Sequence, residues 1–453
     1  MLFNKLRWLN DSQNLNEELT QCRSEGKDIS QFTTEAESII SMPEGDKKRA
    51  AAISLMEKLE NFPVSNKFTF YEPDDFSEII ATLDHSYSET FAYDMNGYRD
   101  NLMGAWEGRC IGCLLGVPVE GWKRDDIVNF LKDTDNYPIS GYLSSQVSSD
   151  IKGKYNIHDN DETTPYDRQK VCWINNVKEF PVDDDINYSV CALRLVEQYG
   201  TDFSTDNVAE TWLYALPAMH VCTAERVAYK NLMNCILPPL TAKYLNPFRE
   251  YIGAQIRVDL YGYIAPGNPS LAAYMAYRDA SLSHVKNGIY GAMYIAALIS
   301  LAPCSKDLLW LVRTAIKQIP SSSRLSNYIY KICDMYDQGK NYDELTDYID
   351  RTFDENSSFD WCHTIPNAML VTINLLFYGH DYNAAITRTV TCGFDTDCNG
   401  ATVGSIVGMM LGKSAIDNKW LKPLEPRVNT SIHKYYSLSI DELVERTYKL
   451  VHK

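Results

Sequence analysis

The sequence has 453 residues, of which 45% are hydrophobic, and a formal net charge of −17. The apolar content is ample for a packed core, and the length fits one large domain or two to three smaller ones. The negative charge argues against a nucleic-acid backbone as partner, because such binding depends on clustered Lys and Arg, but an anionic small molecule remains compatible with it.

Residues 1–95 form the first predicted unit of the chain. They are expected to be helical and polar, and they contain no cluster of residues that suggests chemistry. We expect them to pack on the main domain as an accessory region or to offer a surface to a partner. The character of the sequence changes at Met95, so the predicted division is an accessory region at 1–95 and a main domain at 96–453.

The first helix of the main domain carries a glycine at every fourth position. These glycines, at 104, 108, 112 and 116, share one face of the helix and allow another backbone to approach closely. Val117-Pro118 then ends the helix, and Glu120 follows on the loop. Glu120 is either an exposed loop acid or a carboxylate of a functional site.

Three adjacent aspartates open the next strong helix. Residues 123–180 before them are polar and show little periodicity, which predicts a long loop. Asp183, Asp184 and Asp185 then occupy the cap and first turn of a helix that stops near Gly200. One aspartate is enough for capping, whereas three adjacent ones repel each other unless a cation neutralises them. We therefore favour a metal site over simple capping.

Helical patterns continue through the middle of the chain. Asn268-Pro269 forms a cap and a first-turn proline, His284 lies at the junction to the next helix, and Asn287-Gly288 opens that helix. A histidine at such a junction is either a structural hydrogen-bonding residue or part of a site. We find no convincing strand pattern, so the predicted class is all-α.

The stretch 394–412 combines two carboxylates with a second glycine-patterned helix. Asp395 and Asp397 are two positions apart, so their side chains converge only from a turn or extended backbone before the helix. The glycines at 400, 404, 408 and 412 repeat the spacing seen at 104–116, and we hypothesise that the two helices pack together. The stretch is either a carboxylate turn that holds a hard cation or an acidic cap on a core helix.

The cysteines and the apolar runs indicate the cellular compartment of the protein. Twelve cysteines are scattered, and the Cys110–Cys113 pair has no second pair to complete a zinc site. We interpret them as buried free thiols in a reducing cytoplasm. The N-terminus lacks an apolar signal segment, and the longest apolar run, 288–302, is too short to span a bilayer. The expected location is the cytoplasm, without a membrane partner.

Taken together, the motifs resemble the ADP-ribosylglycohydrolase family, which includes the dinitrogenase-reductase-activating glycohydrolases. The resemblance covers about residues 100–415 and rests on GRCIGCLLGVPVEGW, VDDDINYS, IGAQIR, SLSHVKNGIYGAM and FDTDCNGATVGSIVG, in family order. It implies an orthogonal all-α multi-helix bundle with a dinuclear magnesium centre, to which residues 1–95 would add an N-terminal helical extension.

The resemblance also implies roles for individual residues. The metal ligands would come from Asp183, Asp184, Asp185, Asp395, Asp397 and position 398, the catalytic group would be Glu120 or Asp184, and the substrate would contact Gly253, Ala254, Arg257, His284, Asn287 and Gly288. This chain departs from the family pattern at Asp183 and Cys398, where threonines are usual, and at Gln255, which lengthens the substrate loop. The resemblance implies two Mg²⁺ ions. A thiol is a poor ligand for Mg²⁺, so Mn²⁺ is the alternative.

The predicted activity is metal-dependent hydrolysis of an N- or O-glycosidic bond to ADP-ribose or a related ribosyl group. The expected partner is an ADP-ribosylated or ribosylated substrate. Two alternatives use the same residues: a catalytically silent protein that binds ADP-ribose or serves a structural role, and a di-metal hydrolase that cuts a nucleotide pyrophosphate.

Overall fold

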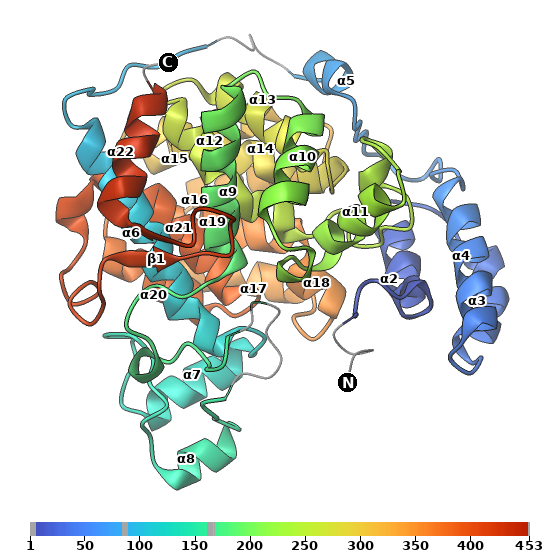
Figure 1. Cartoon of the computed structure of the whole chain (residues 1–453), viewed down its shortest axis with the longest axis horizontal. Helices are drawn as coiled ribbons and strands as arrows, with labels where there is room; N and C mark the ends of the chain where they lie inside the picture. Colours follow the sequence, from blue (N-terminus) through green and yellow to red (C-terminus); the bar gives the residue numbers. More distant parts are fainter. Residues whose placement is uncertain (1–5, 84–88, 161–165, 167, 452–453) are drawn as a thin grey trace.

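The computed structural model describes residues 6–83, 89–160, 166 and 168–451, and helices dominate it (Figure 1). From the N-terminus to residue 264 the helices are α2 (Asp11–Ser24), α3 (Thr33–Ile40), α4 (Asp46–Glu60), α5 (Phe76–Ala81), α6 (Tyr98–Gly116), α7 (Arg124–Asp133), α8 (Ser149–Lys154), α9 (Asp184–Tyr199), α10 (Thr205–Ala215), α11 (Thr223–Met233) and α12 (Asp259–Ile264). The following helices are α13 (Pro269–Ala280), α14 (Lys286–Leu301), α15 (Leu308–Ala315), α16 (Arg324–Asp337), α17 (Tyr342–Thr352), α18 (Ser358–Cys362), α19 (Thr364–Tyr378), α20 (Tyr382–Thr391), α21 (Thr396–Leu411) and α22 (Ile440–Val451). The predicted all-α class is confirmed.

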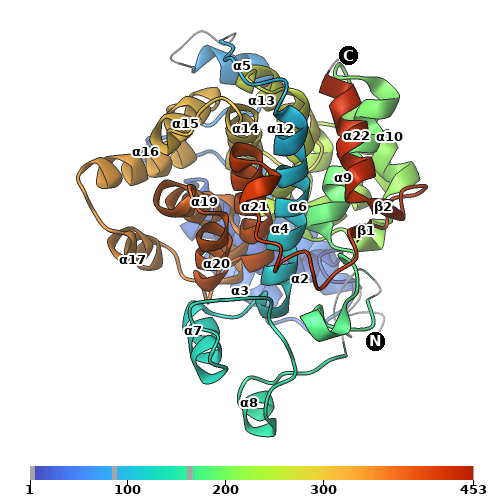
Figure 2. The same cartoon turned by 90° about the vertical axis from the view of Figure 1, so that its left-hand side faces the viewer.

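The two glycine-patterned helices, α6 and α21, pack against each other at the centre of the molecule (Figure 2). They run antiparallel, because Gly104 faces Gly408, Gly108 faces Gly404 and Gly112 faces Gly400. A Cβ atom added at residue 108 would lie only 2.1 Å from the carbonyl oxygen of residue 404. The glycines are therefore required by backbone contact, as hypothesised from their spacing, and the C-terminal end of α6 meets the N-terminal end of α21.

The start of α13 and the end of α9 lie where the local sequence predicts them. The Asn268 side chain accepts a hydrogen bond from the Leu271 N–H at 3.1 Å, with Pro269 as the first helical residue of α13. Helix α9 ends before Gly200, which adopts a φ of 71°, a conformation that glycine reaches without steric cost. Helix α14 is buried along its length after Lys286 and forms the middle of the main hydrophobic core.

Two regions differ from the prediction. The segment 123–180, expected to be a long loop, contains α7 and α8, which project from the bundle in Figure 1. Trp122, which precedes this segment, packs edge to face on Phe130 at 5.4 Å and stacks on Tyr155 at 5.8 Å. Near the C-terminus, β1 (Arg427–Asn429) pairs antiparallel with β2 (Ser437–Ser439). Strands of three residues are too short to give a readable alternation.

The N-terminal helices α2, α3 and α4 have a small hydrophobic core of their own, which residues 244 and 245 of the main domain extend. A buried ionic network attaches them to the rest of the chain. Glu18 and Glu25 of the α2 region accept hydrogen bonds from Arg249 at 2.7 Å each, and Gln21 donates to Glu250 at 2.8 Å. Because these groups are buried, the extension is fixed on the main domain. Among the described residues, no helix has the length and apolarity needed to cross a membrane.

Replacing Arg249 by methionine is expected to lower the free energy of unfolding by about 3–5 kcal/mol, because it removes the cation that pairs with the buried Glu18. It also leaves the buried Glu25 with only lysine partners, of which the nearer is Lys286 at 3.2 Å. Burial opposes ionisation of Glu25, but Arg249 and Lys286 lower its pKa to about 2, against 4.5 ordinarily. A carboxyl with a lowered folded-state pKa stabilises above its unfolded pKa, so this contribution should disappear as the pH falls from about 4.5 to about 2. Chemical denaturation of the wild type and the variant across this pH range measures both effects. Arg23→Met is the control, because Arg23 is exposed on α2, the helix that carries Glu18. This variant should change the free energy of unfolding little.

Candidate metal centre and active-site cavity

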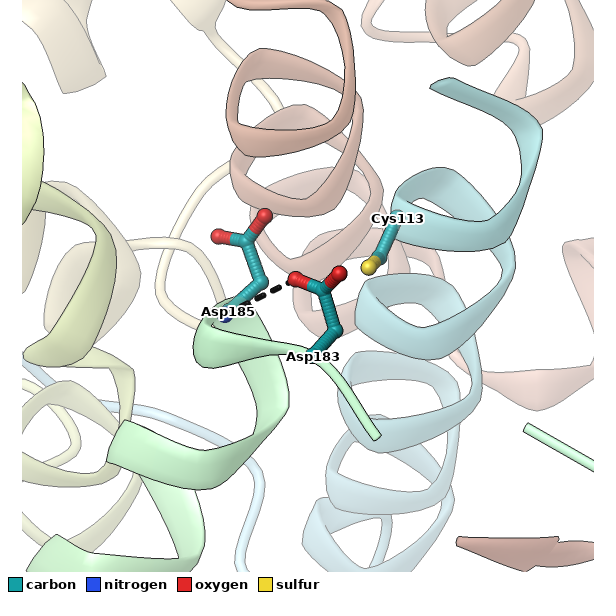
Figure 3. A group of neighbouring side chains, drawn as sticks. All are labelled: Cys113, Asp183 and Asp185. Atoms are coloured by element: carbon teal, nitrogen blue, oxygen red, sulfur yellow. Dashed lines mark hydrogen bonds between the residues drawn. The ribbon is translucent and has the colours of Figure 1, made fainter. Parts of the chain in front are cut away.

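The two acidic clusters predicted from the sequence lie together. Asp183 is the N-cap of α9, and its Oδ1 accepts a hydrogen bond from the Asp185 N–H at 3.1 Å (Figure 3). Asp395 precedes α21, and Asp397 stands in its first turn. Ligand atoms of Asp185, Asp397 and Cys398 all lie within 4.8 Å of one another. Both helix N-termini thus present carboxylates to one point, where the helix dipoles favour negative charge.

The turn before α21 is held in an unusual conformation. Phe394 has a φ of 54°, which is rare for a residue with a side chain. The side-chain oxygen of Asn367 on α19 accepts hydrogen bonds from the Asn399 amide at 2.7 Å and from the Asp395 N–H at 3.4 Å. Asn367 therefore ties the start of α21 to α19 and sets the direction of the Asp395 and Asp397 carboxylates.

Several of these side chains open onto one cavity of about 540 Å³. Its acidic wall consists of Glu120, Asp184, Asp395 and Asp397, with Cys398 beside them. The other walls come from the 3₁₀ turn Val117–Val119 after α6, the described residues of the range 156–173, the start of α11, the 3₁₀ segment Ile252–Arg257, α18 and the N-terminal extension. The segment 123–180 thus contributes to the enclosure of the carboxylates.

The arrangement fits a hard cation. Asp185 Oδ2, Asp395 Oδ1 and Asp397 Oδ1 are buried and accept no hydrogen bond from the described part of the chain. A buried carboxylate oxygen without a partner is costly, and a divalent cation with oxygen ligands would satisfy it. Burial raises the pKa of the Cys398 thiol well above its ordinary value, as do Asp185 and Asp395. The thiol therefore stays protonated here, and the oxygen atoms are the better ligands.

Asp183 and Asp185 differ from the other carboxylates because arginines pair with them. The Asp183 Oδ2 accepts a hydrogen bond from Arg168 at 3.1 Å, so both of its oxygens are already engaged by protein groups. Arg109 of α6 is fully buried and donates to Asp185 Oδ1 at 3.0 Å and to Asp259 Oδ2 at 2.8 Å. Asp185 consequently keeps only Oδ2 for a cation, and any cation contact of Asp183 would share an oxygen.

Burial and mutual repulsion raise the pKa values of three carboxyl groups of the acidic wall. Burial and the neighbouring Asp183 and Asp185 raise the pKa of Asp184 well above its ordinary value. Burial, Glu120 and Asp395 do the same to the pKa of Asp397. The enclosure of the cavity, together with Asp395 and Asp183, raises the pKa of Glu120 to about 8. Divalent cations would offset this repulsion and restore the ionised carboxylates.

Comparison with known proteins assigns the chain to a family. The sequence model described as ADP-ribosylglycohydrolase matches residues 94–452. This chain belongs to the ADP-ribosylglycohydrolase family. It is also similar to a solved structure titled "ADP-ribosylglycohydrolase-related protein complex", with 16% sequence identity, 79% of this chain and 100% of that chain covered, and a TM-score of 0.49. No curated protein matches it. The match leaves the N-terminal extension outside the ADP-ribosylglycohydrolase region.

Only one of the substrate-binding residues suggested by the family resemblance lines the cavity. This residue is Gly253, and a Cβ atom at its position would lie 2.1 Å from Glu225 Oε1, so a larger residue there would displace the Glu225 carboxylate. The other five, Ala254, Arg257, His284, Asn287 and Gly288, are buried and do not line it.

The contacts of Arg257, His284 and Asn287 are with other protein groups. Arg257 donates a hydrogen bond to Glu225 at 2.8 Å and also pairs with Asp279. His284 Nδ1 lies 2.8 Å from Ser283 Oγ. Asn287 donates to Glu250 at 2.9 Å and so belongs to the network that holds the extension.

Several residues at the site escaped the sequence analysis. Glu225 is 1% exposed, yet it lines the cavity, and burial raises its pKa to about 7 although Arg257 opposes the change. Nothing in the amphipathic pattern of α11 distinguishes it from an ordinary helical glutamate. Arg109 did carry a signal, because it is the one charged residue between Gly108 and Gly116 of the glycine-patterned helix, and such a residue needs a buried partner.

Proposed function

We propose that this chain is a metal-dependent hydrolase that cleaves an N- or O-glycosidic bond to ADP-ribose or a related ribosyl group. The observation that carries the proposal is a set of buried carboxylate oxygens beside the cavity, from Asp185, Asp395 and Asp397, that accept no hydrogen bond from the described residues. These oxygens come from two segments more than two hundred residues apart, and both belong to the matched family region.

Two Mg²⁺ ions, or Mn²⁺ in their place, are the proposed cofactors. Asp184, Asp185, Asp395 and Asp397 would hold them, with Asp183 as a further ligand if it shares an oxygen with Arg168. When bound, such ions orient sugar hydroxyls and lower the pKa of a bound water. Arg109 fixes the rotamer of Asp185 by occupying its Oδ1, so Oδ2 keeps one direction.

Glu120 and Asp184 are the proposed proton-handling residues. Both line the cavity, and neither shares the deep burial of Asp395 and Asp397, since Glu120 is exposed and Asp184 is half-buried. Either carboxyl can accept a proton from an attacking water or give one to the leaving group. The fixed carboxylates of the wall would stabilise the positive charge that develops at the anomeric carbon.

The segment 123–180 is proposed to select the acceptor that is released. Its residues Asn156, His158, Tyr166 and Trp173 line the cavity together with the acidic wall. A substrate whose ribose sits at the carboxylates would place its acceptor against these aromatic and polar groups. The released group is therefore expected to differ when this segment is changed, while metal binding is retained.

The nature of the products tests the proposal. The protein is incubated with ADP-ribosylated peptides and with an ADP-ribosylated small molecule in the presence of Mg²⁺ or Mn²⁺, after dialysis against a chelator. We expect free ADP-ribose, no release in chelator, and recovery when the metal is restored. Release of AMP would instead identify cleavage of the pyrophosphate. Binding of ADP-ribose without any turnover would identify a silent binding protein.

A further inference from the structure

The N-terminal extension forms part of the cavity wall. Arg7, Trp8 and Glu17 line the same cavity as Glu120, Asp184 and Asp397. The extension lies outside the family match, which begins at residue 94. The site of this chain therefore has a wall that the family region does not supply.

This wall is fixed by contacts to the main domain. Trp8 packs against a small hydrophobic cluster formed by Ala224, Val227, Phe248, Tyr251 and Phe359. The Asn14 amide donates a hydrogen bond to the Trp8 carbonyl at 2.8 Å, which holds the turn on α2. Glu17 accepts hydrogen bonds from the Tyr251 hydroxyl at 3.0 Å and the Ser358 hydroxyl at 2.8 Å. These contacts fix the backbone at Trp8, so the neighbouring Arg7 has a defined position at the cavity.

Arg7 is the distinctive residue of this wall. Its guanidinium lies over the Trp8 ring, 4.0 Å from the centroid, and the Arg226 guanidinium lies 4.9 Å from the same ring. Arg7 is exposed and makes no ion pair or hydrogen bond with any of the described residues. By contrast, Arg168, the other cavity-lining arginine, pairs with Asp183 at 3.1 Å. Arg7 thus presents to the cavity a positive charge that forms no salt bridge with a described carboxylate, although the charge acts on Glu120 by lowering the pKa of that carboxyl.

The charged groups that line the cavity are mainly acidic, and Arg7 adds a positive charge to them. Glu17, Glu120, Glu225 and the aspartates of the acidic wall all face the cavity, so a phosphate-bearing substrate would meet repulsion away from the metal ions. We propose that Arg7 binds a phosphate group of the substrate at the mouth of the cavity, and this rests on the function proposed above. A guanidinium is suited to phosphate because it donates two parallel hydrogen bonds, and Trp8 holds it in place by cation–π contact.

The test measures binding as well as turnover in the full chain. ADP-ribose is titrated calorimetrically into the wild type and into Arg7→Ala, Arg7→Lys and Arg23→Ala in the presence of Mg²⁺. Arg23 is exposed on α2 and does not line the cavity, so it is a matched control for loss of one charge. We expect Arg7→Ala to weaken the affinity about tenfold, Arg7→Lys to recover part of the loss, and Arg23→Ala to match the wild type. With a phosphate-bearing substrate, KM should rise by a similar factor while kcat changes less than about twofold.

Three results would overturn the inference. If Arg7→Ala binds ADP-ribose as tightly as Arg23→Ala does while the wild type cleaves its substrate, the proposed function stands and the role of Arg7 is wrong. If the wild type neither binds ADP-ribose nor cleaves a ribosyl bond, the proposed function fails and the role of Arg7 fails with it. Adenosine serves as the phosphate-free probe, and equal losses of adenosine and ADP-ribose affinity in Arg7→Ala would indicate a structural effect instead.

Discussion

Replacing Asp397 or Asp184 by asparagine is expected to lower glycosidic turnover at least about 100-fold, because each change removes a carboxylate charge that the cations need. Asn has nearly the shape of Asp, so the cavity is preserved. Without metal, each variant should be at least as stable as the wild type, since Asp397 and Asp184 both experience repulsion from neighbouring carboxylates. With metal, the wild type alone should gain stability, by about 2.7 kcal/mol at a metal concentration 100 times Kd.

The measurements are ADP-ribose release at saturating Mg²⁺ or Mn²⁺ and thermal denaturation with and without each metal. Asp202→Asn is the matched control, because Asp202 is exposed in a turn and does not line the cavity. Its activity and its response to metal should equal those of the wild type. Full activity in both Asp184→Asn and Asp397→Asn would show that the metal assignment is wrong.

The central features of the fold could be predicted because they depend on local rules. Glycine at every fourth position leaves a bare helical face, and the structure shows that Gly104, Gly108 and Gly112 use this face for backbone contact with α21. The aspartates before α9 and α21 were found because a helix N-terminus attracts carboxylates and because three in succession exceed what capping needs.

Other features depend on contacts between distant segments, which one sequence does not reveal. Helix α7 buries only Ile127, Phe130 and Leu131 and is surrounded by polar residues, so its short apolar face was read as part of a loop. The partners of Arg109 lie 76 and 150 residues further along the chain. The contribution of Trp8 to the cavity likewise requires the fold, because its neighbours come from α11, α18 and the segment between them.

Replacing Gly108 by alanine is expected to lower the free energy of unfolding by about 3 kcal/mol or more, the upper part of the range for overpacking. The new Cβ would lie 2.1 Å from the Gly404 carbonyl oxygen and 2.8 Å from its carbon, and neither is the end of a flexible side chain. The helices must therefore separate, and α6 and α21 are both buried along this contact. Thermal and chemical denaturation measure the loss. An unchanged melting temperature would mean that the close approach of the two helices is not required for stability.

Gly153→Ala is the matched control, since Gly153 lies in α8 with no other atom within 4 Å of an added Cβ. The same substitution there should leave stability unchanged or raise it by up to about 1 kcal/mol.

Gly116→Ala tests whether the contact between α6 and α21 also positions the site carboxylates, because its Cβ would lie 2.4 Å from the Asp397 nitrogen. We expect this variant to lose activity out of proportion to its loss of stability, since it displaces the turn that carries Asp395 and Asp397. Equal losses at Gly108 and Gly116 would mean that the helix contact supports the fold but does not set the carboxylate positions.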